Sequence, residues 1–152
     1  MIELNLSPLG SPVGVLGFRV EYSVLRWIGI YTGAGIGIGG PQLAGGIRLR
    51  LEAARWLAFS IAPGVSGGGF TRFSVSGGEK TFAWAIWLNG EISVDFRTSG
   101  GFVCRLFGGV SQMMNPGAVY GDDLCAPGGT ATYHGILVET APIAGIGLGY
   151  AF

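Results

Sequence analysis

The sequence predicts an all-β protein: a closed, antiparallel, up-and-down transmembrane β-barrel of eight strands, with residues 1–152 as a single domain. Three observations predict this fold. Apolar residues alternate with small or charged residues along almost the whole chain, which is the period of a β-strand. Hydrophobic residues make up 49% of the chain and charged residues only 12%, against about 25% charged in a typical soluble domain. Finally, Gly, Ser, Arg or Glu interrupts every apolar run before it reaches the roughly 18 residues that a membrane helix needs.

The composition also excludes several classes of protein. The 30 glycines follow no Gly-X-Y period, which excludes a collagen-like chain. Nine basic residues balance nine acidic ones, so no surplus of positive charge indicates a nucleic-acid partner. Residues 1–5 show neither the basic nor the apolar region of a secretory signal. The chain is therefore expected to be either a mature exported form or a protein that is not exported.

The alternation divides the chain into strands. Between residues 27 and 39, isoleucines occupy even positions and glycines most of the odd ones. Twice, after Glu21 and after Glu52, a short turn leads into Arg-Trp, a pair that suits a membrane–water boundary. The eight expected strands are 2–7, 13–22, 27–38, 42–52, 56–66, 81–97, 102–112 and 131–152, the last of which could begin only after Pro142.

A barrel of ten strands is the alternative. Asn89-Gly90 is a strong hairpin signal that would divide 81–97 into two strands, and a turn at 140–142 would divide the last strand. We favour one strand over 81–97, because the connections then fall into short turns at one end and longer loops at the other, as in outer-membrane barrels. The expected turns are 23–26, 53–55 and 98–101, and the expected loops are 67–80 and 113–130.

Side-chain size indicates which face points inward. A soluble lipocalin-like barrel would bury its bulky apolar face and wet the other one. We call the face with the large apolar side chains the bulky face and the opposite one the lean face. The lean face carries mostly Gly, Ala and Ser rather than the long polar side chains of a wetted exterior, and the bulky face would overfill an eight-stranded lumen. We therefore expect the bulky face to contact lipid. Its expected lipid-facing residues include Phe18, Ile28, Ile30, Leu49, Phe59, Trp84, Ile86, Leu148 and Phe152.

The lean face also carries five acids and five arginines. An eight-stranded lumen is just wide enough for side chains to fill it, and Arg binds carboxylates bidentately, so we expect an ion-pair network that closes the lumen. A narrow path for ions or protons is the alternative. The glycines of this face are interpreted as leaving space for Tyr31 and Trp87. The expected network consists of Glu3, Arg19, Glu21, Arg48, Arg50, Glu52, Glu91, Asp95, Arg97 and Arg105.

The last strand carries a resemblance to a known family. Residues 145–152 have apolar side chains at alternate positions and end on an aromatic, Phe152. With the alternating strands throughout, the chain resembles the small eight-stranded outer-membrane barrels of the OmpX and OmpA-transmembrane-domain type. In that family such a terminal strand is the signal that the barrel-assembly machinery reads. The resemblance implies a bacterial outer-membrane location, with membrane lipid and that machinery as partners.

No catalytic residue is predicted. One family of eight-stranded barrels removes acyl chains from lipid A with a His and a Ser on one outward-facing strand. His134 is expected on an outward face here, but Ile136 stands where that family has its Ser. No residues have the spacing of metal ligands, so no cofactor or metal is expected. Cys104 is expected to face outward and Cys125 to lie in a loop, and whether they pair stays open.

These expectations lead to a function class. The sequence indicates an integral outer-membrane barrel with a filled lumen and a structural or surface-interaction role through loops 67–80 and 113–130, because recognition usually lies on loops carried by a rigid scaffold. Three alternatives remain: a small pore, a lipid-modifying outer-membrane enzyme, and a soluble or virion assembly protein that buries its apolar face between subunits.

Overall fold

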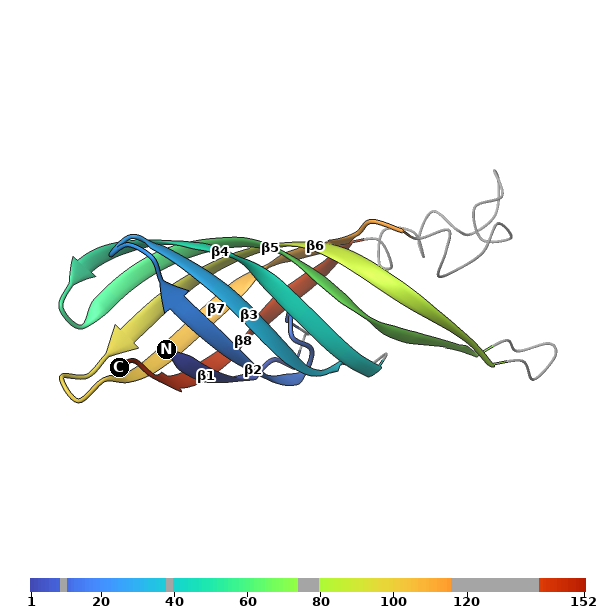
Figure 1. Ribbon diagram of the computed structural model, residues 1–152, viewed down its shortest axis with the longest axis horizontal. Helices are drawn as coiled ribbons and strands as arrows, with labels where there is room; N and C mark the ends of the chain where they lie inside the picture. Colours follow the sequence, from blue (N-terminus) through green and yellow to red (C-terminus); the bar gives the residue numbers. More distant parts are fainter. Residues whose placement is uncertain (9–10, 38–39, 74–79, 116–139) are drawn as a thin grey trace.

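The computed structural model describes residues 1–8, 11–37, 40–73, 80–115 and 140–152, although not the side chains of 70–73 and 80–83. Within these ranges the protein is all-β, and eight antiparallel strands form one closed barrel in which β8 pairs with β1 (Figure 1). The described ranges include no helix long and apolar enough to cross a membrane. The strands are β1 (Ile2–Leu6), β2 (Leu16–Ser23), β3 (Ile28–Gly37), β4 (Gly40–Ala54), β5 (Leu57–Phe73), β6 (Lys80–Arg97), β7 (Phe102–Met113) and β8 (Thr140–Tyr150).

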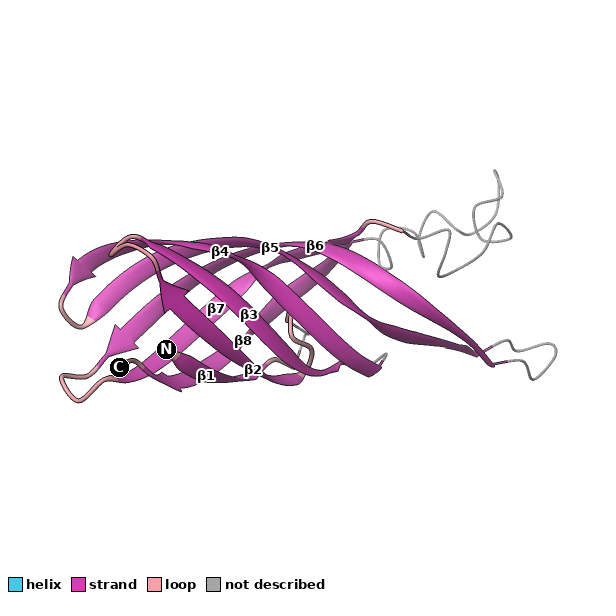
Figure 2. Ribbon diagram, in the orientation of Figure 1, coloured by secondary structure: helices cyan, strands magenta, loops and turns pink. Residues whose placement is uncertain are grey.

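The two ends of the barrel differ in their connections. The β2–β3, β4–β5 and β6–β7 turns lie at one end together with both termini (Figure 2). We call this the turn end. The connections that follow β1, β3, β5 and β7 leave from the opposite end, which we call the loop end. The expected short turns at 23–26, 53–55 and 98–101 are therefore confirmed to within a residue or two.

The described residues form eight strands rather than ten. Residues 80–97 form one uninterrupted strand that pairs with β5 along its whole length, including Pro63 with Gly90. Asn89 is therefore a strand residue and not part of a turn. Its side chain points into the barrel, where its amide nitrogen donates to Ser66 Oγ at 3.0 Å. Likewise, Pro142 lies within β8 and not in a turn. The part of the last expected strand before Thr140 lies outside the described residues.

Two expected boundaries are wrong. Residues 13–15 do not belong to β2, because the chain turns into the barrel there and Gly14 adopts a left-handed conformation with φ of 92°. Residues 67–73 are not an irregular loop but the end of β5, paired in register with β6. Three consecutive glycines at 67–69 carry no side chains that could alternate, so the period was invisible in the sequence.

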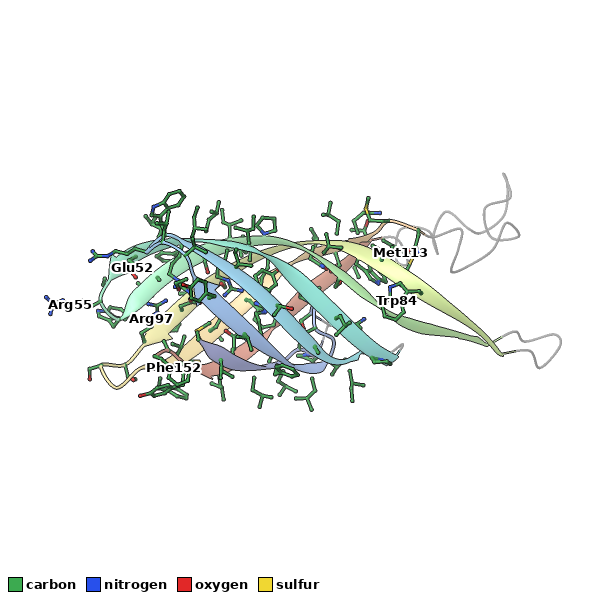
Figure 3. All side chains as sticks on the ribbon, viewed as in Figure 1. Glu52, Arg55, Trp84, Arg97, Met113 and Phe152 are labelled. Atoms are coloured by element: carbon green, nitrogen blue, oxygen red, sulfur yellow. The ribbon has the colours of Figure 1, made fainter. Side chains whose placement is uncertain are left out.

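Bulky apolar side chains cover the outside of the barrel (Figure 3). Along β2, for example, Phe18 and Val20 are exposed, whereas Arg19 and Glu21, which alternate with them, are buried. The same alternation holds in β1, where Ile2 and the following even positions point outward. The barrel is therefore turned inside out relative to a soluble protein: its buried side chains include most of the described charges.

Candidate functional site

The turn-end half of the lumen contains a cluster of eight buried charged side chains from five strands. Each has at most 8% of its side chain exposed. We call this cluster the ionic core. Its members are Glu3 of β1, Arg19 and Glu21 of β2, Arg48 and Arg50 of β4, Glu91 and Asp95 of β6, and Arg105 of β7.

One side of the ionic core is built around Glu91. Arg19 binds this carboxylate bidentately, with Nη1 to Oε1 at 3.0 Å and Nη2 to Oε2 at 2.9 Å. Arg48 adds a third bond, from Nη2 to Oε1 at 2.8 Å. The ring of Tyr31 lies beside both guanidinium groups, 4.7 Å from that of Arg19 and 5.6 Å from that of Arg48. These cation–π contacts fix the two arginines on the loop-end side of the cluster.

The other side is built around Arg105. Its Nε and Nη2 bind the two carboxylate oxygens of Asp95 at 2.6 and 2.9 Å, and its Nη1 donates to Glu3. Glu21 joins the two sides, because it accepts from Arg50 at 2.5 Å and lies 3.6 Å from both Arg48 Nε and Arg105 Nη2. The cluster therefore links opposite walls of the barrel through one connected set of ion pairs.

Strand register brings these residues together. Glu3 is the direct partner of Arg19 across β1 and β2, and Asp95 is the partner of Arg105 across β6 and β7. Small residues on the same face make the necessary space: a side chain at Gly29 would place its Cβ 3.0 Å from Glu21 Oε1. The lumen holds these long side chains because their neighbours on that face are short.

The positive and negative charges of the ionic core are equal in number. Four arginines face four carboxylates, and every member has at least one ion pair. Some donors, including Arg19 Nε and Arg48 Nη1, have no hydrogen-bond partner in the described part of the chain. In a buried and mutually compensated set of charges, the loss of one member leaves its partner uncompensated, so we expect the folded barrel to depend on the complete set.

Glu52 and Arg97 stand apart from the ionic core. They pair at 3.7 Å near the turn end, where 54% and 23% of their side chains are exposed. The structure thus brings all ten expected network residues into ion pairs, but two of them form a separate and partly wetted pair. Of the nine residues expected on the outer face, Ile28 is half-buried and the others are 41–92% exposed.

The loop-end half of the lumen is filled differently, by the chain itself. After β1 the chain folds inward, and residues 11–14 are all buried. We call residues 11–14 the inner segment. Ser11 Oγ donates to the carbonyl of Gly14 at 2.7 Å, and the neighbouring Val15 N donates to the carbonyl of Ile36 at 2.8 Å. In Figure 1 this part of the chain lies within the barrel outline.

Glycines of β2 and β3 form the cradle for the inner segment. A Cβ at Gly33 would lie 2.6 Å from Cγ1 of Val13, and one at Gly17 would lie 2.7 Å from the Val13 carbonyl oxygen. The glycines were expected to make space for Tyr31 and Trp87, and part of their space is instead taken by Val13. Sequence reasoning missed this segment, although the Pro12 and Gly14 that punctuate it were a signal against a strand there.

The remaining site expectations concern residues that react or bind metal. His134 and Cys125 lie outside the described residues. Cys104 is half-buried and has no disulfide partner among the residues that the structure describes. Within the same residues no group of three or more His, Cys, Asp or Glu could hold a metal ion.

Comparison with known proteins adds no relative: no family model, curated protein or solved structure matches the chain.

Proposed function

We propose that the protein is an integral outer-membrane β-barrel with a filled lumen. Its role is structural, or it interacts with other molecules through the connections at its loop end. In this proposal membrane lipid surrounds the barrel, and the barrel-assembly machinery recognises β8 and Phe152, which is 92% exposed. The fold is similar in kind to the small eight-stranded barrels of the OmpX and OmpA-transmembrane-domain type.

One observation carries the proposal: the polarity of the barrel is inverted. Arg19, Arg48 and Arg105 are completely buried, whereas side chains as large as Leu51 and Ile36 are 70% and 65% exposed. In water, an apolar surface that runs around the whole barrel would be far larger than the patches that soluble monomers expose. Hydrocarbon favours this arrangement, and the eight strands pair in a closed ring, as backbone groups in hydrocarbon require.

The turn end supports the same proposal. Trp27 and Trp56 are both more than half exposed, and each follows an exposed arginine in a turn. Aromatic rings and arginines gather where hydrocarbon meets the headgroups. The apolar outer surface thus ends in the residues expected at a membrane interface.

The loop end is the side proposed for interaction. The β5–β6 hairpin extends past the neighbouring strands, since its last pairs, from Gly69 with Trp84 to Phe73 with Lys80, have no counterpart in β4 or β7 (Figure 1). Of the two proposed interaction regions, 67–80 consists mainly of this hairpin, and most of 113–130 lies outside the described residues.

Two experiments test the proposal. We expect the protein to require detergent for extraction at neutral pH, and a sample folded in detergent to migrate differently from a boiled sample on a gel. The boiled sample is the internal control, because it has the same composition and charge. A protein that stays in solution without detergent, or a band insensitive to boiling, would contradict the proposal.

A further inference from the structure

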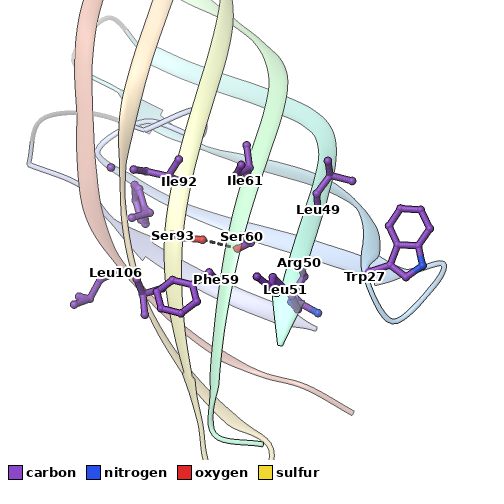
Figure 4. A pocket seen from close by; sticks show the side chains of 13 residues that line it. Trp27, Leu49, Arg50, Leu51, Phe59, Ser60, Ile61, Ile92, Ser93 and Leu106 are labelled. Carbon is purple, nitrogen blue, oxygen red and sulfur yellow. Dashed lines mark hydrogen bonds between the residues drawn. The ribbon is translucent and has the colours of Figure 1, made fainter. Parts of the chain in front are cut away.

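The outer wall of the barrel is hollowed on one side, over β4, β5, β6 and β7 (Figure 4). The groove has a volume of about 660 Å³, within the usual range of ligand pockets. Gly108 lines it, together with Ser60 and Ser93, whose buried side chains point into the lumen and hydrogen-bond to each other at 2.7 Å. Its walls are apolar side chains that point away from the lumen: Leu49, Leu51, Phe59, Ile61, Ile92 and Leu106.

Gly108 explains why the wall is hollow at this point. It is the register partner of Ile92 on β6 and of Ala144 on β8. Of these three neighbouring outward positions, Gly108 and Ala144 carry small residues. A Cβ at Gly108 would meet no atom closer than 3.7 Å, the carbonyl oxygen of Ile143. The space above Gly108 is therefore available to an apolar chain.

An exposed arginine precedes the residue that lines the groove at the turn end. Trp27 lines the groove, and its carbonyl accepts from Arg50 N at 2.9 Å, which holds the β2–β3 turn against β4. Arg26 directly precedes Trp27 and is exposed. Within the described residues Arg26 has no salt bridge, so its charge has no acidic partner there.

The second Arg-Trp pair offers a comparison. Arg55 is also exposed and without a salt bridge among the described residues, but Trp56 does not line the groove. Its ring instead stacks on Phe96, with the centroids 6.4 Å apart. Only the first pair combines an unpaired cation with an adjacent apolar groove.

We propose that this groove and Arg26 form a binding site for one anionic phospholipid of the leaflet at the turn end. An acyl chain lies in the groove, Trp27 packs beside it, and the guanidinium of Arg26 binds the phosphate, whose negative charge no cation in the lipid headgroup neutralises. The inference rests on the proposed membrane location and adds to it a specific lipid and a specific place.

Native mass spectrometry of the full chain released from detergent tests the inference. The probes are phosphatidylglycerol and phosphatidylcholine with identical acyl chains, each titrated separately. We expect the first to bind about fivefold more tightly, which is the contribution of one arginine near an anionic surface. Arg26→Gln should abolish this preference, and the matched variant Arg55→Gln should retain it.

A second pair of variants tests the groove. Gly108→Leu should weaken the binding of both lipids several-fold, because its side chain occupies the space of the acyl chain. Gly90→Leu is the matched control: Gly90 is an exposed glycine of the outer wall, with no atom within 4 Å of its Cβ position, and it does not line the groove.

The outcomes separate this inference from the proposed function. Equal affinity for the two lipids, equal effects of Arg26→Gln and Arg55→Gln, or equal effects of the two glycine variants would overturn the inference while leaving a membrane barrel intact. A protein that needs no detergent to stay in solution would contradict the membrane location itself.

Discussion

The two halves of the lumen are filled in different ways. At the turn end, strand side chains fill it, with four arginines and four carboxylates in one connected cluster. At the loop end, the chain folds inward and places Val13 against bare glycine backbone. The ionic core depends on charge pairing, whereas the inner segment depends on close packing. The two halves should therefore respond to substitution with different magnitudes and different signatures.

The largest effect is expected at Arg105. Arg105→Ala removes the bidentate partner of Asp95 and a donor to Glu3, so two buried carboxylates lose compensation. We expect the free energy of unfolding to fall by about 3–5 kcal/mol. Urea titration of the barrel folded in lipid vesicles, followed by gel mobility, measures it. The control Arg55→Ala removes an exposed arginine and should change stability by about 0.5 kcal/mol or less. Similar losses in the two variants would show that the ionic core contributes no special stability.

A smaller effect within the same half is expected at Arg48. Arg48→Ala takes one of three bonds from Glu91, which keeps its bidentate contact with Arg19. Because that carboxylate remains paired, the loss should lie near the lower end of the range for a broken buried pair, about 3 kcal/mol. Thermal unfolding in detergent should show a clear decrease in the temperature of unfolding. An unchanged melting curve would count against the network.

The loop-end half is probed by filling its cradle. In Gly35→Ala the added Cβ would lie 2.5 Å from the Cα of Gly17, so β2, β3 or the inner segment must shift. We expect a loss of about 2 kcal/mol, as for an overpacked core. Gly90→Ala is the control, since open space surrounds that position. Unfolding in urea measures both, and a neutral Gly35→Ala would contradict the close packing described here.

The smallest effect is expected from the bond that closes the inner segment. Ser11→Ala removes the hydroxyl that donates to the Gly14 carbonyl, which should cost about 1 kcal/mol. The signature matters more than the size: amide hydrogen exchange should increase at residues 11–15 and stay unchanged in the strands that carry the ionic core. Faster exchange throughout the barrel would indicate that the two halves are one cooperative unit.

The turn-end half could be predicted from the sequence because its information is local. Position parity alone assigned Arg19, Glu21 and Arg48 to the inner face, and the lean composition of that face indicated which side was the lumen. The pairing of particular residues could not be predicted, since it depends on register between strands distant in sequence. Glu52 shows the limit of parity: it lies on the correct face, but so near the turn that it is more than half exposed.

The loop-end half could not be predicted, because its packing depends on contacts between residues that are distant in the sequence. Nothing in the period of the chain shows that residues 11–14 enter the barrel, because a turn that packs against a distant strand has no repeat of its own. The glycines of its cradle, such as Gly33, were recognised as places without side chains, but the group that fills that space comes from another part of the chain. The paired glycines at 67–69 were missed similarly, since only their partners on β6 show that they belong to a strand.

The central claim about this barrel is that the bulky face of its strands meets hydrocarbon. Nitroxide labels at positions 59, 60, 61 and 62 of β5, introduced one at a time with Cys104 and Cys125 replaced by Ser, measure this in lipid vesicles. We expect labels at 59 and 61 to collide freely with oxygen dissolved in hydrocarbon and little with a water-soluble nickel complex, and labels at 60 and 62 to be shielded from both. Strong collision of the nickel complex with the labels at 59 and 61 would contradict the account.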